Sequence, residues 1–94
     1  MNASELWTRC LERIREQTEH QSYQTWFEPT NAVELTDGSF KIEVPNRFFA
    51  DWLEEHYMSL IRDAMREAAG RELTPVFQVA HRRPDEYEPV SAAR

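Results

Sequence analysis

Glycine and cysteine are scarce in this 94-residue chain, and their scarcity excludes several kinds of site. With only Gly38 and Gly70, the chain has no glycine-rich loop that cradles phosphates and no Gly-x-x-Gly loop of the RNA-binding type. Cys10 is the single cysteine, so an internal disulfide framework and a cysteine-based zinc cage are both excluded. We expect Cys10 to be a small core residue in a reducing cytosol.

Long apolar runs are also missing, and basic residues are outnumbered. No stretch approaches the roughly 20 apolar residues of a membrane span, and the N-terminus lacks the basic start of a signal peptide. We therefore expect a soluble, cytoplasmic protein with no membrane partner. Eleven basic against seventeen acidic residues give a net charge of -6, which disfavours strong binding to nucleic acid. The only basic clusters are Arg9, Arg13 and Arg15, and Arg82 with Arg83.

Catalytic chemistry has no supporting group of residues. His20, His56 and His81 are far apart in the sequence, and their spacing predicts no metal site. The carboxylates between Asp51 and Glu67 fall on the polar side of a helical pattern, which is typical of a solvated surface. We expect neither enzyme activity nor a cofactor in this chain.

What the chain does contain is enough apolar material for one core. Its hydrophobic fraction is 40%, with 3 Trp, 3 Tyr and 5 Phe, and its length allows one domain. Apolar residues at helical spacing predict a first helix from about Glu5 to Gln17, capped by Asn2 or Ser4. A short second helix follows around residues 23–27 and ends before Pro29.

A longer helical pattern begins after Asn46, a good capping residue, and continues to Gly70, a good helix stop. As one rod it would be roughly 35 Å long, about the diameter of the whole domain. We therefore expect a break near Glu55-His56, which would give two shorter helices.

Asp37-Gly38 is the clearest hairpin signal, since this pair favours a two-residue turn with positive φ angles. Pairing outward from the turn sets Leu35 opposite Phe40 and Val33 opposite Ile42, which places all four apolar residues on one face. The other face, which we expect to be wet, carries Glu34, Lys41 and Glu43.

A third strand is predicted from Leu73 to Ala80, with Pro75 confined to an edge or to the start of the strand. The fold class is therefore α+β, in the order α-α-β-β-α(α)-β, with the helices packed on one face of a three-stranded sheet. Residues 1–80 would form the domain. Residues 81–94, with prolines and charges but no periodicity, would form a flexible linker or tail.

Three stretches carry a family resemblance: Leu6-Trp7-x-x-Cys10-Leu11 with Ile14, Tyr23-x-x-Trp26-Phe27-x-Pro29, and Pro45-Asn46-Arg47-Phe48-x-x-Asp51-Trp52. Together they resemble domain I, the N-terminal domain, of bacterial DnaA-type chromosomal replication initiators. The third stretch is the most specific, because helix capping explains Asn46 but not the residues around it. The resemblance covers residues 5 to 80.

The resemblance implies a KH-like fold and a non-catalytic protein-interaction module of DNA replication initiation. In the family, this domain associates weakly with itself, recruits the replicative helicase DnaB and binds species-specific regulators. A weak affinity for single-stranded origin DNA has also been attributed to it. ATP would be bound only by an AAA+ domain that is absent here, so we expect the chain to be a fragment.

Leu6 and Trp7 match the family's self-association site, and Phe48 matches the aromatic residue used for helicase contact and single-strand binding. Neighbours on a helix lie about 100° apart, so one of each pair Leu6-Trp7 and Phe48-Phe49 can face outward. We expect Trp7 and Phe48 to be the exposed members, while Trp26, Phe27, Trp52 and Leu53 lie in the core or at its margin.

Ser22 and Tyr23 fall in the family's docking segment for the helicase and regulators. Ser22 stands where the best-known members carry an acidic residue, although Glu19 or Glu28 can supply charge nearby. The alternative function is a weak single-stranded nucleic-acid-binding module of KH-like fold. In that case Phe48 would stack on a base and Arg47 would lie near a phosphate.

Overall fold

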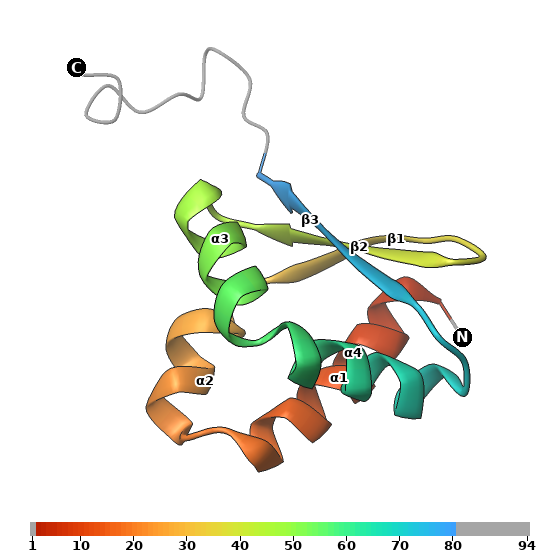
Figure 1. Cartoon of the computed structure of the whole chain (residues 1–94), viewed down its shortest axis with the longest axis horizontal. Coiled ribbons are helices and arrows are strands. Elements are labelled where there is room, and N and C mark those ends of the chain that lie inside the picture. The colour runs from red at the N-terminus through yellow and green to blue at the C-terminus, as the bar shows by residue number, and fades with distance from the viewer. Residues whose placement is uncertain (1, 81–94) are drawn as a thin grey trace.

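Four helices and three strands follow one another in the computed structural model, which describes residues 2–80 (Figure 1). They are α1 (Ala3–Gln17), α2 (His20–Trp26), β1 (Asn31–Leu35), β2 (Ser39–Val44), α3 (Arg47–His56), α4 (Met58–Ala69) and β3 (Thr74–Val79). The order α-α-β-β-α-α-β confirms the predicted α+β class. The predicted flexible segment 81–94 lies outside the described residues.

The helix ends follow the capping chemistry of the sequence. Asn2 caps α1 by accepting a hydrogen bond from the Glu5 amide at 2.8 Å, and α1 therefore starts at Ala3 instead of Glu5. Asn46 caps α3 in the same way, as predicted, through the Phe49 amide at 3.1 Å. The expected break in the long helical pattern falls at the junction between α3 and α4.

Gly70 ends α4 in the left-handed conformation, with φ of 77°. This is the conformation for which glycine is the preferred residue, because a Cβ would crowd the following carbonyl. Its amide donates to the Arg66 carbonyl at 2.8 Å and so completes the last turn of the helix. The chain then turns back toward the sheet and enters β3.

The sheet has the strand order β1-β2-β3 and is mixed. β1 and β2 are antiparallel, whereas β2 and β3 are parallel, because α3 and α4 carry the chain back to the starting end of β2 before β3 begins. In the strand order, β3 has β2 as its only neighbour within the described chain and is therefore an edge strand. This agrees with the confinement predicted for Pro75, which pairs with Phe40 near the start of β3.

Two details of the predicted hairpin are wrong. Leu35 faces Phe40 as expected, but a bulge between Ala32 and Glu34 shifts the register, so that Ala32 faces Ile42. Val33 is the extra residue and is 42% exposed instead of lying on the core face.

The turn at Asp37-Gly38 also departs from the prediction, because Gly70 is the only residue with positive φ in the described part of the chain. The Thr36 amide donates a hydrogen bond to the Ser39 carbonyl at 2.9 Å, and the Thr36 hydroxyl accepts one from the Ser39 amide at 3.2 Å. The backbone and the side chain of Thr36 therefore close the turn together, without the left-handed backbone that the residue pair predicts.

The helices cover one face of the sheet, and the core lies between this face and the helices (Figure 1). α1 and α4 pack along each other, and α1 also contacts β1, while α3 packs on β2 and β3. The fully buried large side chains come from every layer: Leu6, Ile14, Phe27, Phe40, Ile42, Leu53, Ile61, Met65 and Leu73. Across residues 2–80, none of the helices has the length and apolar character that a membrane crossing requires.

Candidate functional site

An aromatic stripe runs along one side of α3. Phe48, Trp52 and His56 follow one another at intervals of four residues, which places them on the same side of a helix. The ring centroids of Phe48 and Trp52 are 6.1 Å apart, and those of Trp52 and His56 are 4.1 Å apart. The three rings therefore form a continuous row.

α2 contributes a fourth ring to this row. Trp26, the last residue of α2, stacks on Trp52 with centroids 4.9 Å apart and an interplanar angle of 12°. The same indole lies 5.7 Å from the Phe48 ring and 5.0 Å from the Phe49 ring. We refer to Trp26, Phe48, Phe49, Trp52 and His56 as the aromatic patch.

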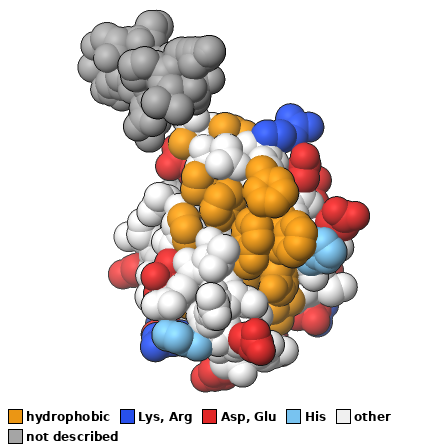
Figure 2. All heavy atoms as spheres, turned by 90° about the vertical axis from the view of Figure 1, so that its left-hand side faces the viewer, with side chains coloured by type: hydrophobic (Ala, Val, Ile, Leu, Met, Phe, Trp, Pro, Cys, Tyr) orange, Lys and Arg blue, Asp and Glu red, His pale blue; other side chains and the backbone are white. Residues whose placement is uncertain are grey.

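The aromatic patch is partly open to solvent. Phe48 is 60% exposed, the highest value among the exposed large hydrophobic residues of the described chain. Trp26, Phe49 and Trp52 are half-buried, and Figure 2 shows a continuous hydrophobic surface on the side where α2 and α3 lie. An exposed apolar surface of this kind is typical of a protein-interaction site.

Charged side chains border the aromatic patch. Arg47 forms an ion pair with Asp51 at 3.3 Å, and His56 lies 4.0 Å from a carboxylate oxygen of Glu55. Figure 2 shows acidic side chains along the edge of the hydrophobic surface. The border therefore favours a partner with basic groups around an apolar centre.

Trp52 carries a polar atom without a partner in the part of the chain that the structure describes. Its Nε1 is buried and makes no hydrogen bond. Burying such a donor costs about 1–3 kcal/mol. The stacking of Trp52 on Trp26 and its tilted contact with His56 offset part of this cost, since aromatic pairs contribute about 0.5–1.5 kcal/mol each.

The expected exposure of Trp7 is wrong. Trp7 is 4% exposed and Leu6 is 1% exposed, so both face the interior. The Trp7 indole donates a hydrogen bond from Nε1 to the Thr30 hydroxyl at 3.0 Å and packs edge-on against Phe40. α1 packs against the sheet on one side and against α4 on another. Its buried face is therefore wide enough to include both Leu6 and Trp7. The self-association role expected for Leu6 and Trp7 loses its physical basis.

Tyr23 is also a core residue and offers little surface. It is buried, it stacks on Phe27 with centroids 6.0 Å apart, and burial raises the pKa of its hydroxyl. The guanidinium of Arg15 lies 5.9 Å from the centre of its ring. Ser22 is half-buried, and the residue of α2 that contacts Phe48 is Trp26.

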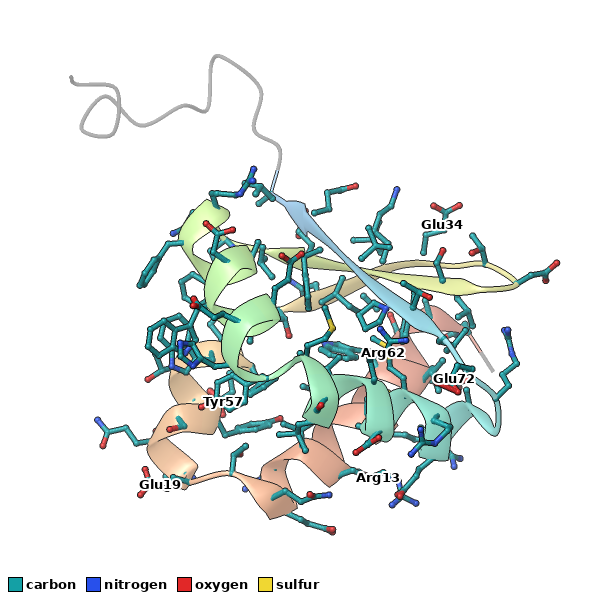
Figure 3. The ribbon with its side chains drawn as sticks, viewed as in Figure 1. Arg13, Glu19, Glu34, Tyr57, Arg62 and Glu72 are labelled. Atoms are coloured by element: carbon teal, nitrogen blue, oxygen red, sulfur yellow. The ribbon has the colours of Figure 1, made fainter. Side chains whose placement is uncertain are left out.

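Trp26 and Trp52 are the functional candidates that sequence reasoning missed. Both lie at the margin of the core, as expected, but their contact with Phe48 was not foreseen. The four-residue spacing of Phe48, Trp52 and His56 could have revealed the stripe on α3. The spacing of Trp26 gives no indication that α2 ends against this stripe on α3. Figure 3 shows the side chains that gather where α2 and α3 meet, beside Tyr57.

No group of three His, Cys, Asp or Glu side chains that could hold a metal ion exists within residues 2–80. Cys10 is fully buried, and burial raises the pKa of its thiol from 9.0 to about 12. A thiol in this state carries almost no thiolate at neutral pH, so it is a packing residue and not a nucleophile. The aromatic patch is therefore the strongest candidate site.

Comparison with known proteins supplies the family. The sequence model of one family, described as the DnaA N-terminal domain, matches residues 4–67, which is most of the domain. The chain belongs to the DnaA N-terminal domain family. This match includes every residue of the aromatic patch.

Three curated members of the DnaA family show how far the similarity extends. A chromosomal replication initiator protein DnaA from Flavobacterium psychrophilum is 40% identical over 77 residues, and one from Chlorobaculum tepidum is 31% identical over 77. Both alignments cover 82% of this chain. A third DnaA protein, from Thermodesulfovibrio yellowstonii, is 33% identical over 70 residues, and its alignment covers 74% of this chain. The aligned part is 16% of the length of each of these relatives.

A solved DnaA structure shares the fold. It comes from a complex of HobA with DnaA domains I–II from Helicobacter pylori, with a TM-score of 0.68. The match covers 82% of this chain and 99% of that chain, at 12% sequence identity. The DnaA domain I fold is therefore shared, and the mixed three-stranded sheet with four helices belongs to it.

Proposed function

We propose that this domain is the protein-interaction module of a chromosomal replication initiator, and that it docks partner proteins through the aromatic patch. The partners would be the replicative helicase DnaB and regulators of initiation. The observation that carries the proposal is the 60% exposure of Phe48 beside the stacked rings of Trp26 and Trp52. The solved DnaA relative with this fold is itself bound to a protein, HobA.

The geometry of the aromatic patch suits protein binding. Large aromatic side chains dominate interface energetics, because they bury much apolar area and lose little rotamer entropy. Trp26 and Trp52 hold each other by stacking, so the surface beneath Phe48 is ordered before a partner arrives. A preorganised surface of this kind lowers the entropic cost of association.

The experiment compares the full chain with two variants. Phe48→Ala removes the exposed ring from the patch, and Val33→Ala is the matched control, because Val33 is also exposed and apolar but lies in β1. Binding of the N-terminal part of the helicase is measured by isothermal titration calorimetry. The proposal expects Phe48→Ala to weaken binding at least tenfold, as for an interface residue worth above about 1.4 kcal/mol. Equal affinities for the two variants would contradict it.

Self-association is also proposed, on the strength of family membership, but with a different anchor. Leu6 and Trp7 are buried, whereas Phe48 has the exposed apolar surface that an interface between two copies needs. Light scattering at rising concentration should show the mass of the wild-type chain increasing and that of Phe48→Ala staying monomeric. A monomeric wild-type chain at every concentration would remove self-association from the proposal.

Single-stranded DNA is the second candidate ligand, favoured by the adjacency of exposed Phe48 and Arg47. The Arg47 side chain is paired with Asp51, which weakens its attraction for a phosphate. We therefore rank DNA below protein partners. A salt-dependent affinity for an oligothymidylate that Phe48→Ala and Arg47→Ala both reduce would raise it, and no binding at millimolar concentration would exclude it.

A further inference from the structure

The outer edge of β3 carries backbone groups that no strand of the described chain pairs with. On the inner edge, the amides of Thr74 and Ala80 donate to carbonyl groups of the hairpin turn and of β2, at 3.0 and 2.8 Å. A parallel ladder uses every second residue of a strand. The amides of Phe77 and Val79 therefore point to the outer edge.

This edge is protected only at its start. The backbone nitrogen of Pro75 faces the outer edge, as do those of Phe77 and Val79, but proline has no N–H to donate. The rest of β3 carries no charged residue, and Val76 and Val79 are each 39% exposed. Natural proteins usually blunt an open edge with charge or proline, so the second half of β3 is free to pair with another strand.

A groove runs between this half of β3 and α3. Its cavity of about 210 Å³ is lined by Ala50, Phe77 and Val79 together with three charged residues of α3, Arg47, Asp51 and Glu54. A closed apolar cavity of about 150 Å³ accommodates a benzene ring, so this one has room for an apolar side chain. The groove lies on a different flank of α3 from Phe48 and Trp52, because their positions are rotated about the helix axis.

The charge of the groove border selects the kind of partner. Arg47 is held by Asp51 at 3.3 Å, whereas Glu54 forms none of the ion pairs found within residues 2–80. The border therefore has an excess of negative charge, and the whole chain carries a net charge of -6. A segment with Lys or Arg beside an apolar residue is complementary to it.

We propose that β3 accepts an extended basic segment of a partner protein as a fourth strand of the sheet. Backbone groups of the segment pair with the amides of Phe77 and Val79, an apolar side chain enters the groove, and a Lys or Arg reaches Glu54. Strand addition of this kind draws its affinity from backbone hydrogen bonds and its specificity from alternate side chains. The site is separate from the aromatic patch and does not depend on the function proposed for it.

The test uses the full chain and a blocked peptide of alternating valine and lysine. Hydrogen exchange is followed by NMR while the peptide is added. The proposal expects exchange at Phe77 and Val79 to slow, with smaller changes at Val76 and Gln78, whose amides already belong to the ladder with β2. Alternating valine and glutamate forms the control peptide and should bind at least tenfold more weakly.

Three variants sharpen the test. Val79→Pro removes one outward amide at a position where an edge strand tolerates proline, and Val79→Ala is its control, because it keeps that amide. Val79→Pro should weaken peptide binding about tenfold more than Val79→Ala does. Glu54→Gln should weaken it without touching the strand.

The proposal would be overturned by equal affinities for Val79→Pro and Val79→Ala, by equal binding of the two peptides, or by NMR changes confined to the aromatic patch. No binding at millimolar peptide would overturn it as well. Phe48→Ala should bind the peptide like the wild type. The outcome is therefore independent of whether the aromatic patch docks the helicase.

Discussion

Trp7→Ala should mainly lower the stability of the domain, whereas Phe48→Ala should mainly weaken partner binding. Trp7 is 4% exposed, contacts Phe40 edge-on and donates a hydrogen bond to Thr30, so its removal leaves a cavity in the core. Truncation of a buried tryptophan costs about 3–5 kcal/mol. A domain of this size is stable by about 5–10 kcal/mol, so Trp7→Ala removes a large part of the total.

Phe48 is 60% exposed and is held by ring contacts with Trp26 and Trp52. Its truncation should cost about 1–2 kcal/mol, because the lost contacts are two partly solvated aromatic pairs and no core cavity forms. Urea unfolding followed by circular dichroism measures both values. The reasoning would be refuted if Trp7→Ala lowered the free energy of unfolding by less than about 1 kcal/mol, or if Phe48→Ala lowered it more than Trp7→Ala.

Substitutions at three further positions test the fold and the core. Gly70→Ala should destabilise the domain by about 1–2 kcal/mol in urea unfolding, because φ of 77° is strained for any residue with a Cβ although no atom lies within 4 Å of it; no loss would contradict the left-handed end of α4. Asn46→Ala should cost about 1 kcal/mol by removing the cap of α3, and Asn46→Asp, which can cap as well, should retain stability. Burial raises the pKa of the Cys10 thiol from 9.0 to about 12, so the stability that this group contributes is fully present below pH 9 and is lost as pH rises toward 12. The wild type should therefore lose more stability than Cys10→Ala over this range, and parallel pH profiles would argue against it.

Much of the fold could be predicted because its signals are local. Asn46 and Gly70 mark helix ends by capping chemistry, and the break between α3 and α4 follows from the size of a domain. The bulge at Val33 could not be predicted, because Ala32 and Val33 are both apolar and the pairing with β2 depends on tertiary packing. The left-handed conformation predicted for Asp37-Gly38 was wrong, because hydrogen bonds of the Thr36 backbone and hydroxyl with Ser39 close the turn without it.

The candidate site was predicted only in part. Exposure of Phe48 was confirmed, while that of Trp7 was wrong, although the same reasoning was applied to both. The difference lies in what surrounds each helix. α1 packs against both β1 and α4, so its buried face includes both Leu6 and Trp7, whereas Phe48 of α3 meets Trp26 and remains 60% exposed. Neighbours of this kind are set by the packing of distant segments, which helical periodicity does not reveal.

The most direct test of the docking surface uses the three tryptophans as separate reporters. Trp26 and Trp52 belong to the aromatic patch, while Trp7 is sealed against Phe40 and Thr30. Nitrogen-15 spectra of the indole N–H groups are recorded while the N-terminal part of the helicase is added. We expect the Trp26 and Trp52 signals to shift on binding and the Trp7 signal to stay in place. A shift of Trp7 with the other two unchanged would contradict it.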